Sequence, residues 1–91
     1  MTDAPEVIGS RLKNLREALG IKTQVKFAEE IGIEKNTYNP FEKGARTLTF
    51  EAACKIRQKF KIPIDWLFWG EDDEIPYHIK VKLEARRQAA A

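Results

Sequence analysis

The sequence holds very few of the residues from which catalytic and metal sites are built. Its 91 residues include one cysteine, one histidine and one serine, which are Cys54, His78 and Ser10. No nucleophile motif surrounds them, and they do not cluster at the short spacings of metal ligands. The five glycines are isolated, which excludes a glycine-rich phosphate loop. We therefore expect no enzyme activity, no cofactor and no metal site, and no small-molecule ligand is evident.

Long apolar stretches are also absent. No hydrophobic run approaches the roughly 20 residues that cross a bilayer, and the first residues lack the basic region and apolar run of a signal peptide. A single cysteine cannot form an internal disulfide, which fits a reducing compartment. With 43% hydrophobic and 33% charged residues the composition is that of a globular protein. We expect one cytoplasmic domain without a membrane partner.

Apolar residues recur at helical spacing along the whole chain. No segment alternates apolar and polar residues long enough to indicate a strand, so the predicted fold class is all-α. The predicted helices cover residues 10–19, 23–31, 34–43, 49–60 and 64–69, with a last helix after Pro76.

Polar caps and glycines set the expected ends of these helices. The side-chain oxygen of an N-cap accepts a backbone N–H, and a glycine after the last turn adopts a left-handed conformation easily. The predicted N-caps are Ser10, Thr23 and Thr49, and the predicted stops are Gly20, Gly32, Gly44 and Gly70. The buried stripe predicted for the fourth helix is Phe50, Ala53, Ile56 and Phe60.

The segment from Thr23 to Gly44 is the most informative. It predicts two short helices joined by a turn at Gly32, with Ala28 small enough for the helices to cross closely, as a helix-turn-helix requires. Together with its flanks it resembles the Cro/C1-type (XRE-like) helix-turn-helix family of bacterial and phage repressors. The matching motifs are Arg11-Leu12-Lys13-x-Leu15-Arg16, Thr23-Gln24-x-x-Phe27-Ala28, Gly32-Ile33, Thr37, Glu42-Lys43-Gly44 and Ile62-x-Ile64-Asp65-Trp66-Leu67.

The resemblance covers about residues 10–70 and implies a five-helix λ-repressor-like domain, here with an additional C-terminal helix. It implies a DNA-binding transcriptional regulator, expected to be a repressor, which inserts its third helix into the major groove of double-stranded DNA. By position, Gln24 matches a residue that binds a DNA phosphate. The base-reading face of the third helix is matched by Lys35, Asn36 and Asn39. Lys43 and Arg46, at the end of that helix and in the loop after it, match phosphate clamps.

The chemistry of these side chains agrees with the implied roles, but other roles stay open. Asparagine pairs with adenine through two hydrogen bonds, and lysine donates to guanine acceptors. Without the resemblance, the three cations would be ordinary solvated charges, the asparagines turn or cap residues, and Gln24 a simple surface residue. Arg16 and Glu42 match positions that commonly form an ion pair between the first and third helices.

Pro40 departs from the family pattern. Inside the third helix it removes the hydrogen bond to the Asn36 carbonyl, at a cost of about 3 kcal/mol in a regular helix. The sequence predicts either a kink after one turn or a restart with Asn39 as N-cap, and both outcomes shorten the reading surface. The alternative function is therefore a degenerate helix-turn-helix domain that serves as a protein-interaction module without specific DNA readout.

Charge divides the chain into three parts. Residues 10–70 hold 12 Lys and Arg against 7 Asp and Glu, whereas both flanks are net negative, so the total of +2 hides a basic centre. This asymmetry is expected if only the centre meets phosphate. We predict a flexible N-terminal arm over 1–9, the helix-turn-helix domain over 10–70, and an acidic turn with a C-terminal helix and tail over 71–91.

The last helix offers a modest apolar surface made of Ile79, Val81 and Leu83. This surface either packs back against Trp66 or Trp69 or pairs with its copy in a homodimer. Repressors of this class commonly dimerise to read two half-sites one helical turn apart. We therefore expect a homodimer.

Overall fold

Six α-helices make up the part of the chain that the computed structural model describes, residues 1–90. They are α1 (Pro5–Ala18), α2 (Gln24–Ile31), α3 (Lys35–Lys43), α4 (Phe50–Phe60), α5 (Ile64–Trp69) and α6 (Tyr77–Ala90). The predicted all-α class, with five helices and an additional C-terminal one, is confirmed. Ala91, the end of the predicted C-terminal tail, lies outside the described residues.

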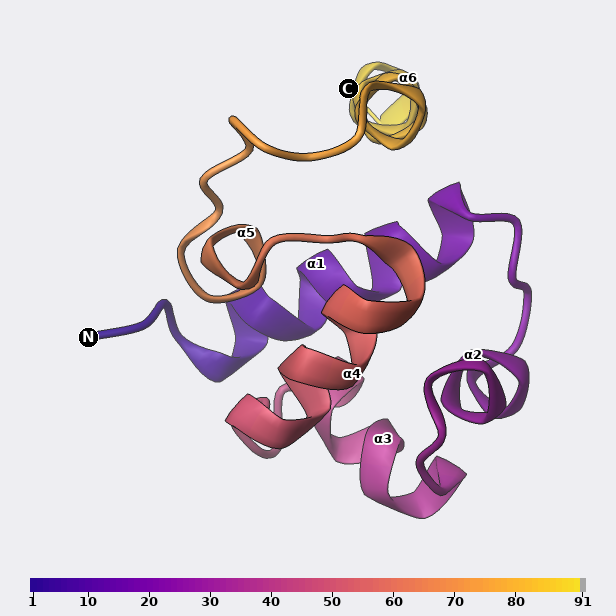
Figure 1. The fold of residues 1–91 in the computed structure, drawn as a ribbon, viewed down its shortest axis with the longest axis vertical. Helices are drawn as coiled ribbons and strands as arrows, with labels where there is room; N and C mark the ends of the chain where they lie inside the picture. The colour runs from indigo at the N-terminus through magenta and orange to yellow at the C-terminus, as the bar shows by residue number, and fades with distance from the viewer. Residues whose placement is uncertain (91) are drawn as a thin grey trace.

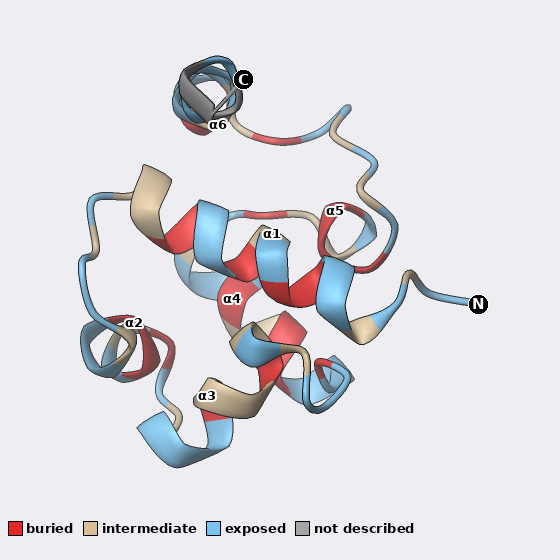
Figure 2. Ribbon diagram, turned by 180° about the vertical axis from the view of Figure 1, so that it is seen from behind, coloured by how far each residue is buried: buried red, intermediate tan, exposed pale blue. Residues whose placement is uncertain are grey.

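Helix α1 forms the centre of the molecule. It packs against α3, α5 and α6, while α2 packs against α3 and α4. In both views α1 lies between α6 on one side and α3 on the other (Figure 1, Figure 2). The helix-turn-helix and the C-terminal helix therefore occupy opposite sides of α1.

The core is apolar and draws on every helix (Figure 2). Phe27 of α2 stacks on Phe60 of α4, with ring centroids 5.4 Å apart. The ring of Phe27 also contacts that of Tyr38 of α3, with centroids 5.1 Å apart. Phe27 and Tyr38 are completely buried. Since burying one large apolar side chain stabilises a fold by about 1.5–3 kcal/mol, these rings hold α2, α3 and α4 together.

The predicted caps of α2 and α4 are confirmed. The hydroxyl of Thr23 accepts the backbone N–H of Lys26, and the hydroxyl of Thr49 accepts that of Ala52, each at 3.2 Å. At the other end of α2, Gly32 has a left-handed φ of 78°, which glycine adopts without a steric penalty. The chain can therefore turn from α2 into α3 within a few residues.

The predicted start of α1 is wrong. The helix begins at Pro5, so Ser10 lies inside it and caps nothing. Proline suits the first position of a helix, and the completely buried Ile8 extends the apolar stripe one turn earlier than expected. Residues 5–9 of the predicted flexible arm are thus helical, while the division of the chain into three parts stays a prediction.

Gly9 allows α1 to lie unusually close to α3. A Cβ atom added at this glycine would be 2.5 Å from the carbonyl oxygen of Glu42 and 2.9 Å from that of Phe41. Both contacts are with backbone, which cannot move aside as a flexible side chain could. The absence of a side chain at Gly9 therefore sets the distance between the two helices.

One of the two outcomes predicted for Pro40 is wrong. Helix α3 is continuous from Lys35 to Lys43, so it does not restart at Pro40 and Asn39 is not an N-cap. The alternative of a kink after one turn stays a prediction. The carbonyl of Asn36 loses its usual donor, but Asn36 is exposed and water can bond there. The local cost of about 3 kcal/mol is also outweighed by burial of Tyr38 and Phe41 on the same helix.

The buried stripe predicted for α4 is only partly correct. Ala53 and Ile56 are completely buried and Phe60 is half-buried, but Phe50 is 68% exposed. Phe50 is the first residue of α4, where the helix projects beyond the core. Ala52, which the predicted stripe did not include, is buried in the core.

The choice left open for the C-terminal helix is decided for two of its three apolar residues. Ile79 is buried and Leu83 packs against the same core, whereas Val81 is 46% exposed. Arg86 also ties α6 to α1 through a hydrogen bond of 2.6 Å to Glu17. Ile79 and Leu83 therefore pack back onto the protein's own core, and the expected homodimer stays a prediction.

Candidate nucleic-acid interface

Helices α2 and α3 with the turn between them form a helix-turn-helix. Ala28 is 1% exposed, and its carbonyl accepts the backbone N–H of Ile33, at 3.0 Å, from the far side of the turn. The small side chain of Ala28 lets α3 cross α2 closely. This arrangement presents the first turn of α3 to solvent.

A buried ion pair fixes α3 to α1. The guanidinium of Arg16 donates to both carboxylate oxygens of Glu42, at 3.1 and 2.8 Å. It also donates to the carbonyls of Ile21 and Lys22 in the connection from α1 to α2, at 3.1 and 2.9 Å. The expected pair between the first and third helices is confirmed, and Arg16 additionally holds the chain that leads into α2.

Glu42 is the centre of a larger network. Its carboxylate also accepts the hydroxyl of Tyr38, at 2.6 Å, and the side-chain amide of Gln24, at 3.3 Å. Burial raises the pKa of Glu42, but the hydrogen bonds from Arg16, Tyr38 and Gln24 outweigh it and hold the pKa below its ordinary value. Burial raises the pKa of Tyr38, and the bond to Glu42 raises that of Arg16. The carboxylate and guanidinium thus stay ionised inside the protein.

Two of the six residues expected to bind DNA belong to this network. The side-chain amide of Asn39 donates to the Oε1 atom of Gln24, at 2.5 Å, and both residues are half-buried. Sequence reasoning missed this contact because it joins two helices and depends on how they cross. The network therefore orients Gln24 and Asn39 from inside the protein.

The other four residues are exposed and lie at the two ends of α3. Lys35 and Asn36 form its first turn, whereas Lys43 ends it and Arg46 follows in the loop. Within residues 1–90, none of these three cations lies within 4.0 Å of a carboxylate. Their charges are therefore available to a polyanion.

Comparison with known families identifies this arrangement. A family model described as a helix-turn-helix domain matches residues 9–73, which is more than two thirds of the chain. The chain belongs to the helix-turn-helix family. The match runs from within α1 to beyond the end of α5, and the resemblance to the Cro/C1-type (XRE-like) family is confirmed.

Two known proteins are similar in sequence to this helix-turn-helix protein. The transcriptional repressor RstR of the cryptic phage CTXphi, from Vibrio cholerae serotype O1, is 36% identical over 77 residues, covering 82% of this chain and 68% of the repressor. The antitoxin PezA of Streptococcus pneumoniae serotype 4 is 30% identical over 90 residues, covering 93% of this chain. The chain spans 55% of that antitoxin. No solved structure matches the chain significantly.

Family membership and the similarity to a repressor support a DNA-binding regulator rather than an enzyme. The described range 1–90 contains no group of three His, Cys, Asp or Glu side chains that could hold a metal ion. Among its helices, none combines the length and the hydrophobicity needed to cross a membrane.

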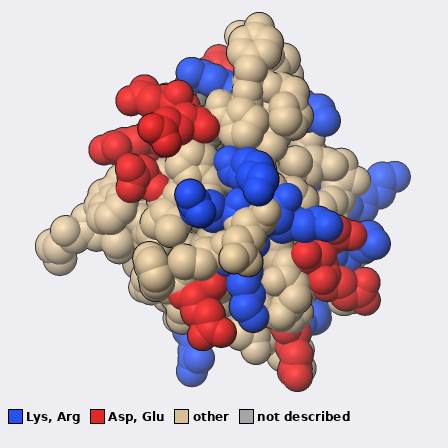
Figure 3. Space-filling view, viewed as in Figure 1, with Lys and Arg blue, Asp and Glu red and all other residues tan. Residues whose placement is uncertain are grey.

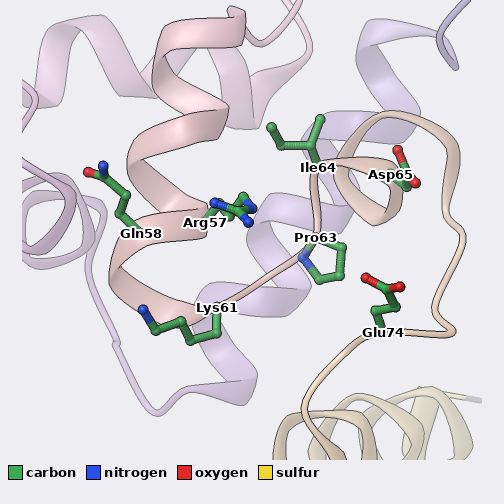
Figure 4. Close-up of a pocket in the computed structure, with 7 residues that line it drawn as sticks. All are labelled: Arg57, Gln58, Lys61, Pro63, Ile64, Asp65 and Glu74. Carbon is green, nitrogen blue, oxygen red and sulfur yellow. The ribbon is translucent and has the colours of Figure 1, made fainter.

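Other charged surfaces of this helix-turn-helix protein are less suited to a polyanion. Acidic side chains gather where α5 leads into α6, over the sequence Glu71-Asp72-Asp73-Glu74 (Figure 3). Beside the C-terminal end of α4, a depression of about 430 Å³ combines Arg57 and Lys61 with Asp65 and Glu74 (Figure 4). Its carboxylates would repel phosphate, so the ends of α3 remain the candidate interface.

Proposed function

We propose that this protein is a transcriptional repressor that binds duplex DNA by inserting α3 into the major groove. The observation that carries the proposal is the exposed first turn of α3, with Lys35 and Asn36, on a helix anchored by the Arg16–Glu42 pair. An α-helix fits the B-DNA major groove, which is about 12 Å wide. The repressor role itself rests on the similarity to RstR.

Base reading is assigned to Lys35, Asn36 and Asn39. Asn39 uses one N–H of its amide for Gln24, so its second N–H and its Oδ1 atom stay available for the two hydrogen bonds that recognise adenine. Gln24 has one N–H left after bonding Glu42, which suits a phosphate oxygen. The network then fixes the orientation of both amides before DNA binds.

Lys43 and Arg46 are assigned to the DNA backbone. Arg46 has its backbone N–H bonded to the carbonyl of Pro40, at 3.2 Å, so the loop after α3 is fixed relative to the helix. Contacts of this kind set the register and strength of binding without reading sequence. The alternative of a helix-turn-helix without DNA readout rests on Pro40, and a continuous α3 from Lys35 to Lys43 favours DNA readout over it.

Titration with random-sequence duplex DNA at several salt concentrations tests the proposal. Affinity should fall steeply as salt rises, because each neutralised phosphate releases counterions, with a slope of about −0.9 per contact. The control variant Lys82→Ala changes an exposed cation on α6, on the other side of α1, and should leave the slope unchanged. Absence of measurable binding at low salt would contradict the proposal.

A further inference from the structure

A depression of about 430 Å³ beside the C-terminal end of α4 is lined by charges of both signs. The end of α4 contributes Arg57 and the residue that caps it, Lys61. The carboxylates come from Asp65 of α5 and from Glu74 of the connection to α6. The volume falls within the range of about 300–1,000 Å³ that is typical of small-molecule sites. We call this site the α4 depression.

The cations and carboxylates of the α4 depression do not neutralise one another. Among the side chains that the structure describes, no oppositely charged group lies within 4.0 Å of any of these four. The two cations lie on one side and the two carboxylates on the other, with Pro63 and Ile64 between them (Figure 4). The α4 depression therefore has a positive end, an apolar middle and a negative end.

The backbone at Lys61 adopts a left-handed conformation that disfavours any residue with a side chain. Its φ is 62°, and within residues 1–90 it is the only residue other than glycine with a positive φ. Helices α2, α3 and α5 end instead at Gly32, Gly44 and Gly70. A Cβ atom crowds the backbone in this conformation, and such strain gathers at ligand sites. The lysine therefore has a reason beyond ending α4, and the α4 depression provides it.

We propose that the α4 depression binds a small zwitterion with an apolar body, which is the chemical class of free amino acids and short peptides. The ligand's carboxylate lies toward the two cations, its ammonium group toward the two carboxylates, and its apolar part on Pro63 and Ile64. Other classes match only half of this lining. The carboxylates repel a phosphate or a nucleic acid, the cations repel a polyamine, and the end of a protein chain brings only one charge.

Binding should be weak, because the four charged side chains are exposed and water screens exposed ion pairs. We expect leucine to bind with a dissociation constant on the order of 1 mM. The α4 depression lies at the C-terminal end of α4, whereas the chain from α3 enters α4 at its N-terminal end (Figure 1). The ligand site therefore does not rest on the proposed DNA binding, and either can fail without the other.

Nuclear magnetic resonance of the isotope-labelled chain tests the site. During titration with leucine up to about 20 mM, the backbone amide shifts should saturate and should be largest for residues 57–65 and 74. Leucyl-leucine repeats the titration with a wider separation of its charges, and saturation by either compound supports the proposal. Glycine has the same charges but no apolar side chain, so it should bind about threefold more weakly than leucine or worse. Absence of saturating shifts at these residues with both leucine and leucyl-leucine would overturn the proposal.

Lys61→Gly separates ligand binding from the stability of the fold. Glycine adopts the left-handed conformation freely, so the variant should melt at or above the temperature of the wild type. Its affinity for leucine should nevertheless fall by about threefold. Lys59→Gln is the matched control, because Lys59 is an exposed cation of the same helix that does not line the α4 depression. A Lys61→Gly variant that binds leucine as tightly as the wild type would overturn the proposal.

Ligand analogues test the orientation. Leucine amide lacks the carboxylate and N-acetylleucine lacks the ammonium group, so both should bind more weakly than leucine. Lys61→Gly should weaken binding of leucine but not of leucine amide, and Glu74→Gln should weaken binding of leucine but not of N-acetylleucine. Glu71→Gln is the carboxylate control, because Glu71 is exposed in the same connection but does not line the α4 depression. Equal weakening of leucine and leucine amide by Lys61→Gly would overturn the orientation.

Discussion

Arg16 and Glu42 hold each other through two hydrogen bonds, although 26 residues separate them in the chain. Their side chains are only 7% and 4% exposed. Arg16 also bonds the connection into α2, and Glu42 also bonds Tyr38 and Gln24. One charged pair thereby joins α1, α2 and α3, so the surface proposed to meet DNA is set from within the protein.

Removal of one partner of this pair should destabilise the fold strongly. Arg16→Ala leaves the buried carboxylate unpaired, and the expected loss is about 3–5 kcal/mol in the free energy of unfolding. Urea denaturation measures this loss. The exposed pair of Lys26 with Glu30 is the control, and Lys26→Ala should cost about 0–1 kcal/mol. Equal losses for the two variants would contradict a structural role for the Arg16–Glu42 pair.

Glu42 should make stability depend on pH in the acid range. Its pKa is lower in the folded protein than its ordinary value of 4.5, so the unfolded chain binds the proton more readily. The contribution of Glu42 is therefore complete above about pH 4.5 and is lost as pH falls through the folded pKa. Thermal unfolding between pH 2 and 7 should show a smaller pH slope for Glu42→Gln. Identical slopes in the two proteins would contradict this prediction.

Gly9→Ala should be destabilising although alanine favours helices. The new methyl group would meet the backbone of Glu42 and Phe41 and push α1 from α3, at an expected cost of about 1–3 kcal/mol. Ser10→Ala is a matched control, because Ser10 is the next residue of the same helix and is exposed. That control should be neutral or slightly stabilising. Chemical denaturation measures the stability of both variants. A Gly9→Ala variant as stable as the wild type would contradict the close approach of α1 to α3.

Pro40→Ala should stabilise the protein. The substitution restores a donor for the Asn36 carbonyl and removes a proline from the helix interior. The free energy of unfolding should rise by about 2 kcal/mol, because the greater freedom of alanine in the unfolded chain offsets part of the gain. Pro5→Ala is the control, since Pro5 is the first residue of α1, where proline is favourable. Pro5→Ala should lower the free energy of unfolding by up to about 1 kcal/mol. Melting temperatures of both variants test this, and destabilisation by Pro40→Ala would contradict it.

The two ends of α3 should affect DNA binding differently. Lys35→Ala with Asn36→Ala should reduce discrimination between DNA sequences, because each good base contact contributes about 1–3 kcal/mol of discrimination. Lys43→Ala with Arg46→Ala should weaken all sequences alike and reduce the salt slope by about 2. Selection of bound sequences from a random pool, followed by titration, measures both effects. If Lys35→Ala with Asn36→Ala weakened binding to all DNA sequences equally, these two residues would be assigned to the DNA backbone instead of the bases.

Local signals predicted most of the fold. Thr23 and Thr49 cap their helices as expected because an N-cap bond joins residues three apart in the chain. Gly32 and Gly44 end theirs with a left-handed φ. Phe50 shows the limit of this reasoning, because it has helical spacing with the core residues of α4 but lies beyond the core. Spacing predicts which residues share a face, and packing decides how far the core extends.

The resemblance named the residues of the candidate site, but it did not reveal how they contact one another. The resemblance located Gln24 and Asn39, yet the hydrogen bond between them depends on how α2 crosses α3. Pro40 was judged by its local cost, whereas burial of Tyr38 and Phe41 keeps α3 continuous. Local preferences of a few kcal/mol yield to tertiary burial of similar or larger size.

The sequence by itself determined the helical class and the helix-turn-helix, because these follow from apolar spacing, capping residues and a short turn, while its resemblance to known repressors indicated the family. Only the tertiary structure decided that α1 separates α3 from α6, that Glu42 gathers three side chains around it, and that Tyr77 and Val81 of α6 stay exposed. Those features depend on contacts between residues far apart in the chain. Such contacts form only when several helices pack together, so no local pattern records them.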